Sequence, residues 1–95
     1  MVRVVAPNYI KSEHIKDVEP LFREMIAATR KEKGCIEYRL HTKKGESGLF
    51  IFIEEWASQA DLDNHIASEH FQRIIPQVAK FKSKDAEAFV MDEFN

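Results

Sequence analysis

Cysteine, glycine and proline are scarce in this chain, with one, three and three residues among 95. The single cysteine, Cys35, excludes a disulfide within the chain and any zinc or iron–sulfur site that needs several cysteines. No apolar run approaches the ~20 residues that a helix needs to cross a bilayer, so no membrane partner is expected. The N-terminus begins with a strand pattern instead of a signal peptide, which favours a cytoplasmic location.

An excess of charge of one sign is also missing. The formal net charge is −2, and acidic and basic residues are interspersed without forming a basic face. Nucleic acid is therefore not an expected partner. Apolar residues, by contrast, make up 44% of the chain, and ten side chains are aromatic. A chain of this size buries roughly 60–65% of its unfolded surface, so we expect one folded domain over residues 1–95.

Alternating apolar and polar residues predict strands over residues 2–9, 35–42, 49–56 and 86–94. The polar segment 43–48 has the length of a hairpin connection. The third strand is apolar on both faces, which a strand tolerates only when both of its sides are covered. One face holds Phe50, Phe52 and Trp56, and the other holds Leu49, Ile51 and Ile53.

Apolar residues at helical spacing predict helices between these strands. The first helix covers residues 15–29, with Ser12 as its expected cap and Gly34 as its expected end. Pro20 lies inside this pattern, and either a kink or a later helix start would accommodate it.

Two more helices are expected after the third strand. Ser58 and Asp61 form an S-x-x-D start that resembles a capping box, which predicts a short helix. Ser68 is the expected cap of the next helix, whose apolar stripe includes Phe71 and Ile75.

This order of elements predicts an α+β fold, the ferredoxin-like βαββαβ sandwich, with two helical crossovers on one face of the sheet. The opposite face keeps aliphatic residues from the first and third strands. A bare apolar face of several hundred Å² is an aggregation liability in a monomer. We therefore expect a homodimer that buries one sheet against the other.

Three segments carry a family resemblance: Gly34–His41, Phe52–Trp56 and Leu62–Phe71, the last with the pattern H-x-x-S-x-H-F. With them the chain resembles the antibiotic biosynthesis monooxygenase (ABM) domain family over nearly its whole length. The resemblance implies a dimeric α+β barrel with a hydrophobic pocket between sheet and helices in each subunit. Many members oxidise phenolic or quinol-like aromatics with O₂ and no cofactor. Other branches are isomerase-like enzymes of a small signalling metabolite, or heme degraders.

The candidate catalytic residues are Asn8, Trp56, His65 and His70. Asn8 is in phase with apolar residues, so its amide either meets a substrate oxygen or oxygen intermediate, or marks an exposed strand end. Trp56 is either a core side chain or part of the pocket, and the resemblance favours the pocket. Either histidine can accept a phenolic proton, because imidazole titrates near neutrality, and His65 is slightly preferred.

The expected substrate-binding residues are Phe50, Phe52, Glu54, Phe71 and Ile75. If Glu54 is buried without a partner, its pKa rises and it can accept a proton. A salt bridge between Glu54 and Arg39 or a lysine is the favoured alternative. Tyr38 is expected to be structural or to lie at the rim of the pocket.

No metal and no cofactor are expected. His65 and His70 are five residues apart across a helix break, unlike the i, i+4 pairs of helical zinc sites. The heme-degrading branch carries a histidine ligand where this chain has Ile75, which cannot ligate iron. No nucleotide-binding glycine motif is present either.

The residues and the resemblance together predict a cofactor-independent monooxygenase that oxidises a small apolar aromatic, a quinol or phenol, with O₂. A dimeric binding or stress-response module that sequesters a small apolar metabolite without turnover is the first alternative. An isomerase of a small signalling metabolite, a keto-sugar phosphate, is the second, and the lack of clustered basic residues counts against it.

Overall fold

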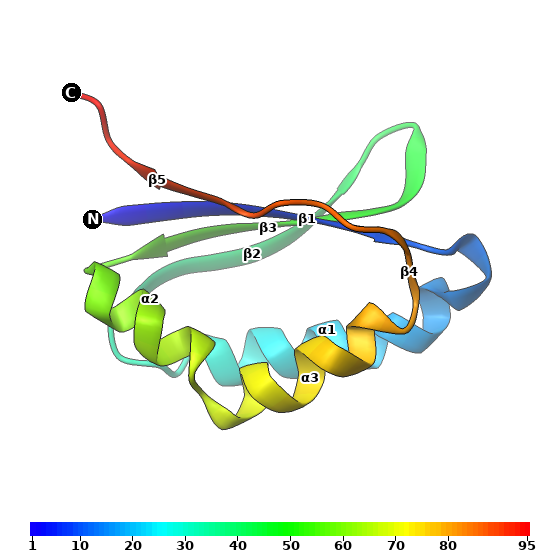
Figure 1. Ribbon diagram of the computed structural model, residues 1–95, viewed down its shortest axis with the longest axis horizontal. Helices are drawn as coiled ribbons and strands as arrows, with labels where there is room; N and C mark the ends of the chain where they lie inside the picture. Colours follow the sequence, from blue (N-terminus) through cyan, green and yellow to red (C-terminus); the bar gives the residue numbers. More distant parts are fainter.

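A β-sheet and a layer of helices make up the computed structural model, which describes residues 1–95 (Figure 1). The strands are β1 (Val2–Ile10), β2 (Cys35–Lys43), β3 (Glu46–Trp56), β4 (Lys82–Lys84) and β5 (Phe89–Asp92). The helices are the 3-10 helix η1 (Ser12–His14), α1 (Ile15–Thr29), α2 (Gln59–Ile66) and α3 (Glu69–Ala79). None of these helices has both the length and the apolar character that a membrane span requires.

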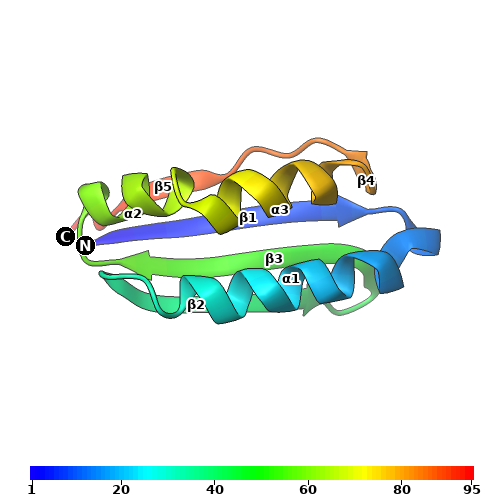
Figure 2. The same ribbon diagram turned by 90° about the horizontal axis from the view of Figure 1, so that it is seen from below.

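The sheet is antiparallel in the order β2-β3-β1-β4, and β5 pairs with the same edge of β1 as β4 does. Figure 2 shows α1 lying over β2 and β3, while α2 and α3 follow β1 and the C-terminal strands. Both crossovers therefore cover one face of the sheet. This arrangement confirms the predicted α+β, ferredoxin-like fold.

The pairing of β1 with β3 brings the candidate side chains to the face beneath the helices. Val4 pairs with Glu54, and Asn8 pairs with Phe50. Residues that pair directly across antiparallel strands project from the same face, and residues two apart on a strand do so as well. Glu54, Trp56, Phe50 and Asn8 thus share one face, and all four are buried.

The core between the layers holds α1 against the sheet. Val18, Phe22 and Met25 project from α1 and are almost completely buried. The Phe22 ring packs against Phe50 and Phe52, with centroids 5.2 and 5.5 Å away. Burial of each such side chain contributes about 1.5–3 kcal/mol to the stability of the fold. This cluster therefore holds α1, the first crossover helix, against the sheet.

The predicted starts of α2 and α3 are confirmed. Ser58 Oγ accepts a hydrogen bond from the Asp61 backbone at 3.1 Å, and Ser68 Oγ accepts one from the Phe71 backbone at 3.3 Å. The predicted cap of the first helix is wrong. Ser12 lies within η1, and α1 starts three residues later without a side-chain cap.

The first helix spans the predicted residues and stops at Thr29, but Gly34 is not its terminating residue. Gly34 lies further along, in the turn into β2, with a φ of 81°. A Cβ at Gly34 would collide with the Asp61 carboxylate, so glycine lets this turn approach the start of α2. Pro20 lies inside α1, which rules out a helix start at that residue.

The predicted last strand over residues 86–94 is shorter, and a separate strand, β4, precedes it. β4 pairs with Tyr9 and Ile10 of β1, whereas β5 pairs with residues 2–5. The gap between the two lies beside Pro7, which has no backbone N–H to donate. A continuous strand along this edge of β1 is therefore interrupted at the proline.

The sheet face away from the helices retains apolar side chains. Ile51 and Ile53 are half-buried there. Val5 pairs with Ile53 on one side and with Phe89 on the other, and Phe89 is 51% exposed. The prediction that β3 is apolar on both faces is thus confirmed.

Candidate functional site

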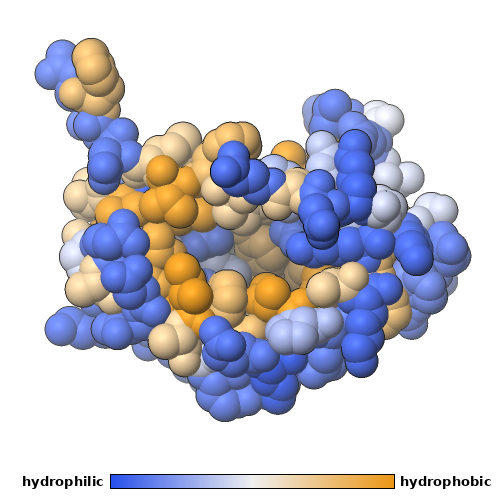
Figure 3. Space-filling model, in the orientation of Figure 1, coloured by the Kyte–Doolittle hydropathy of each residue, from blue (hydrophilic) through white to orange (hydrophobic).

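A cavity of about 200 Å³ lies between the sheet and helices α2 and α3. Eleven of its sixteen lining residues are apolar, and they come from both layers and from the segment between β4 and β5. Figure 3 shows a hollow rimmed by hydrophobic residues between the C-terminal segment and the helices. The polar lining residues are Asn8, Tyr38, Glu54, His65 and Lys82.

Glu54 is the carboxylate in the cavity wall. It is 5% exposed, and its Oε1 accepts a hydrogen bond from Trp56 Nε1 at 3.0 Å. The alternative salt bridge with Arg39 is absent, because Arg39 projects from the opposite face, where it lies 4.0 Å from Glu37. Burial raises the pKa of Glu54 to about 7, although the Trp56 hydrogen bond opposes this. Near neutrality, Glu54 is therefore a mixture of acid and carboxylate.

His65 is the imidazole in the cavity wall. Its ring lies on Trp56, with centroids 4.7 Å apart, and the rings of Tyr38 and Phe71 meet it edge-on at 5.6 and 5.2 Å. Its Nδ1 is 2.6 Å from Glu32 Oε2. Burial lowers the pKa of His65, and the hydrogen bond with Glu32 offsets part of this effect. His65 is therefore neutral at neutral pH and can accept a proton.

Asn8 has a fixed amide orientation. Its Nδ2 donates to the backbone oxygen of Ala6 at 3.1 Å. Because that carbonyl can only accept, the amide oxygen must point elsewhere. Asn8 lines the cavity and is 9% exposed, so its Oδ1 is an acceptor available to a ligand.

Asn8 Oδ1, Glu54 Oε2 and His65 Nε2, which belong to residues lining the cavity, make no hydrogen bond to another protein group. Thr29 Oγ1 is the only side-chain oxygen or nitrogen that is both unpaired and sealed from solvent. Because none of these three atoms is sealed in that way, each keeps some access to open space, and the residues that carry them line the cavity. Together they offer a proton acceptor in His65, a partly protonated acid in Glu54 and a hydrogen-bond acceptor in Asn8.

His70 lies behind His65 and not in the cavity wall. Its Nε2 is 3.1 Å from Glu32 Oε2 and 3.3 Å from Ser68 Oγ. One ligand atom each of Glu32, His65 and His70 lies within 4.8 Å of the others, and such side chains can coordinate transition metals. Direct hydrogen bonds account for this cluster, and the absence of a metal stays a prediction.

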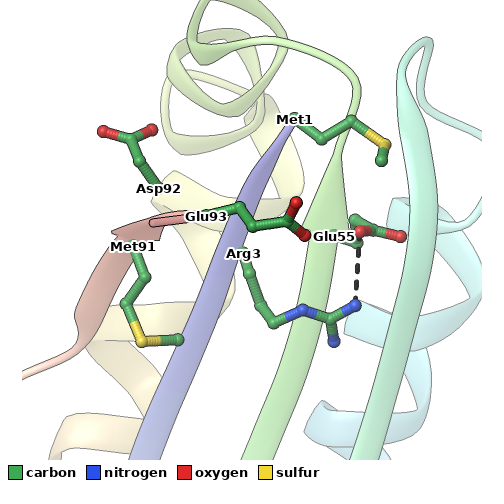
Figure 4. Close-up of a pocket in the computed structure, with 6 residues that line it drawn as sticks. All are labelled: Met1, Arg3, Glu55, Met91, Asp92 and Glu93. Atoms are coloured by element: carbon green, nitrogen blue, oxygen red, sulfur yellow. Dashed lines mark hydrogen bonds and ion pairs between the residues drawn. The ribbon is translucent and has the colours of Figure 1, made fainter. Parts of the chain in front are cut away.

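A second depression, of about 370 Å³, lies on the sheet face away from the helices (Figure 4). It is lined by Met1, Arg3, Glu55, Met91, Asp92 and Glu93. Arg3 Nη2 donates to Glu55 Oε2 at 3.2 Å across it. Charged residues dominate this depression and none of the predicted site residues lies there, so the cavity beneath the sheet is the candidate site.

Residues 1–77 match the sequence profile of the family described as antibiotic biosynthesis monooxygenase. The chain belongs to this family. YcnE of Bacillus subtilis (strain 168), described as a candidate monooxygenase, is 31% identical over 74 residues, which are 76% of this chain and 78% of YcnE. A crystal structure of an antibiotic biosynthesis monooxygenase covers all of both chains at 40% identity and a TM-score of 0.96. A conserved protein from Methanosarcina mazei Go1 is 33% identical, with a TM-score of 0.92 and coverage of 95% and 89%.

Six of the nine site residues predicted for this family member line the cavity: Asn8, Phe52, Glu54, His65, Phe71 and Ile75. Trp56 does not, because it is completely buried beneath His65, where it supports the imidazole and holds Glu54. Phe50 packs against α1 instead, and His70 lies behind the wall. The roles of all nine residues stay predictions.

Two residues that shape this ABM-family site are not among the nine predicted ones: the sequence predicts Tyr38 only as structural or at the rim, and it does not single out Glu32. Tyr38 is 3% exposed and lines the cavity, because it pairs with Glu54 across the hairpin. Burial raises the pKa of Tyr38 well above its ordinary value, so its hydroxyl stays protonated. Glu32 lies in the polar turn between α1 and β2, where a glutamate carries no local signal. The pairing of the hairpin offered a clue to Tyr38, but nothing local offered one to Glu32.

Proposed function

We propose that this protein is a cofactor-independent monooxygenase that oxidises a small electron-rich aromatic, a phenol or quinol, with O₂. The observation that carries the proposal is the apolar cavity lined by Asn8, Glu54 and His65, each of which has a polar atom without a protein hydrogen bond. An apolar cavity of about 150 Å³ holds benzene. The space of about 200 Å³ in this protein therefore favours a substrate with one or two rings over a larger polycycle.

His65 supplies the base in this proposal. Its neutral Nε2 accepts the phenolic proton, and the phenolate is then electron-rich enough to pass one electron to O₂. The phenoxyl radical and superoxide combine at a ring carbon, ortho or para to the oxygen, that still carries hydrogen, which forms a C–O bond and a peroxide. The apolar walls keep water away from these intermediates.

Glu54 supplies the acid. Its carboxyl group, partly protonated near pH 7, donates a proton to the peroxide oxygen. The carbon-bound proton then leaves while the O–O bond breaks, so that one oxygen atom stays on the ring as a quinone carbonyl. The other oxygen leaves as water. The net reaction converts a phenol and O₂ into a quinone and water without a further reductant.

Asn8 and the aromatic residues position the substrate. Asn8 Oδ1 accepts a hydrogen bond from a second hydroxyl of a quinol substrate, since its Nδ2 is already bonded to Ala6. Phe52 and Phe71 pack against the ring from β3 and α3. Trp56 acts through His65 and Glu54 and does not touch the substrate.

The test is oxygen consumption with a panel of one- and two-ring quinols and phenols. The wild-type protein should consume oxygen faster than uncatalysed autoxidation, and His65→Asn should lose about 10²-fold or more of that rate. His41→Asn is the matched control, because His41 is exposed on the other face of the sheet. A wild-type rate equal to autoxidation for the whole panel would overturn the proposal.

A binding protein without turnover is the second candidate, and the preponderance of apolar lining residues favours it. Trp56 is the single tryptophan and lies against His65, so a ligand that contacts His65 should change its fluorescence. Quenching of Trp56 without product formation would support binding alone. A phosphorylated substrate for an isomerase is not favoured, because Lys82 is the single cationic residue in the wall.

We also propose that the protein is a homodimer whose subunits pack through the sheet faces away from the helices. Ile51, Ile53 and Phe89 leave apolar surface on that face, and no element of the same chain covers it (Figure 1). Sedimentation velocity at micromolar concentration should give a dimer, and Ile53→Lys should dissociate it. A stable wild-type monomer would contradict this assembly. A cytoplasmic location stays a prediction from the sequence.

A further inference from the structure

The H-x-x-S-x-H motif forms one hydrogen-bonded cluster around Glu32. Glu32 lies 33 positions before His65 and belongs to the turn between α1 and β2. Its Oε2 lies 2.6 Å from His65 Nδ1 and 3.1 Å from His70 Nε2. A single carboxylate oxygen is thus shared by both histidines of the motif.

The partners of each nitrogen determine where the protons lie. A carboxylate can only accept, so His65 Nδ1 carries its proton and His65 Nε2 is left bare in the neutral ring. Ser68 Oγ donates its one hydrogen to the backbone oxygen of His65 at 2.6 Å. Ser68 Oγ can then only accept from His70 Nε2, as Glu32 does, so this nitrogen also carries a proton.

The groups of this cluster have little freedom to rearrange. The backbone of Glu32 donates to Thr29 O at 3.0 Å and accepts from the Cys35 N–H at 3.3 Å, which fixes the turn. Trp56 lies against the His65 ring, and Tyr38 and Phe71 meet it edge-on, so that rotation of the imidazole is hindered.

We propose that Glu32 is a positioning residue that holds His65 as its Nδ1–H tautomer, with Nε2 bare towards the cavity. His70 and Ser68 complete the cluster by holding the Glu32 carboxylate in place. Which imidazole nitrogen carries the proton is set by the hydrogen bond of the other nitrogen, and a base in the wrong tautomer cannot accept at Nε2. This inference rests on the proposed function of His65 as the base.

Other charged groups lie near the cluster, and they contribute to how the protonation of His65 depends on pH. Burial lowers the pKa of His65; the hydrogen bond and charge of Glu32 raise it, and the charge of His70 lowers it further. Burial raises the pKa of Glu54, and the charge of Glu32 adds to this. The hydrogen bond from Arg73 lowers the pKa of the exposed Glu24 on α1, and the charge of His70 adds to this. A tautomer measurement separates the hydrogen bond of Glu32 from these charge effects.

The experiment is long-range ¹H–¹⁵N NMR of the imidazole nitrogens in protein labelled at histidine, above neutral pH. The wild type should show His65 mainly as the Nδ1–H form. Glu32→Ala should turn it into a mixture of tautomers, and Glu32→Asp should restore part of the original population. Asp17→Asn is the matched control, because Asp17 lies 2.8 Å from His14 Nδ1 and should affect His14 alone.

Two outcomes would overturn the proposal: wild-type His65 mainly in the Nε2–H form, or nitrogen shifts of His65 that Glu32→Ala leaves unchanged. With an active substrate, Glu32→Ala should lower kcat about 10²-fold or more while KM changes little. The NMR result does not depend on turnover. A confirmed tautomer without oxygen consumption would therefore refute the monooxygenase function alone, whereas full activity of Glu32→Ala would refute the positioning role alone.

Discussion

Replacement of Glu54 by glutamine should remove a pH-dependent loss of stability. Burial raises the pKa of Glu54 from 4.5 to about 7 in the folded protein. Between these values the folded state binds more protons at this group than the unfolded state does. The stability that protonated Glu54 contributes is therefore fully present below pH 4.5 and is lost as the pH rises through about 7.

The magnitude follows from the difference between the two pKa values. At 1.36 kcal/mol per pH unit, the difference between 4.5 and about 7 corresponds to about 3 kcal/mol of unfolding free energy. Glutamine does not titrate, and its amide oxygen can still accept the hydrogen bond from Trp56 Nε1. The variant should therefore resemble the wild type in acid and be about 3 kcal/mol more stable at alkaline pH.

Urea denaturation of both proteins over this pH range measures the effect. The titration of His65 contributes to both curves and cancels in their difference. Glu55→Gln is the control, because Glu55 follows directly in β3 but faces the other side, where it pairs with Arg3 at 3.2 Å. A difference between Glu54→Gln and wild type that does not change with pH would refute the assignment of a raised pKa to Glu54.

Three further substitutions test the packing and the site. Trp56→Phe should lower the free energy of unfolding, measured in urea, by about 2–4 kcal/mol. The smaller ring leaves unfilled space in the core, and Glu54 loses the hydrogen bond from Trp56 Nε1. An unchanged urea midpoint would contradict this. Gly34→Ala should lower stability by about 2 kcal/mol or more in thermal unfolding, because the positive φ disfavours alanine and the new Cβ collides with Asp61. An unaltered Tm would show that the turn relaxes without cost. Asn8→Ala should raise KM for a quinol about 10-fold with a smaller effect on kcat, and an unchanged KM would remove Asn8 from substrate binding.

The parts of the fold that follow from local periodicity could be predicted from the sequence. The alternation in β3 placed Glu54 and Trp56 on one face, and the short side chains of Ser58 and Ser68 identified both helix starts. Ser12 failed as a cap because the chain enters a 3-10 helix before α1, and no local pattern separates these two outcomes.

The parts that depend on contacts between distant segments could not be predicted. Gly34 is required by the approach of its turn to Asp61, and Glu32 reaches His65 because the same turn lies beside α2. The sequence identified the two histidines of the motif, but it could not show that a third residue joins them. It left Trp56 open between core and pocket, and the family resemblance favoured the pocket, whereas the structure buries this ring beneath His65.

Oxygen incorporation decides whether this cavity performs the proposed chemistry. The wild-type protein and His65→Asn are each incubated with a quinol or phenol that the wild type consumes, under ¹⁸O₂ in ordinary water. The product is analysed by mass spectrometry before its carbonyl oxygens exchange with water. The proposal predicts a wild-type quinone that carries one heavy oxygen atom, formed far more slowly by His65→Asn. A product without the label, or equal yields from both proteins, would contradict it.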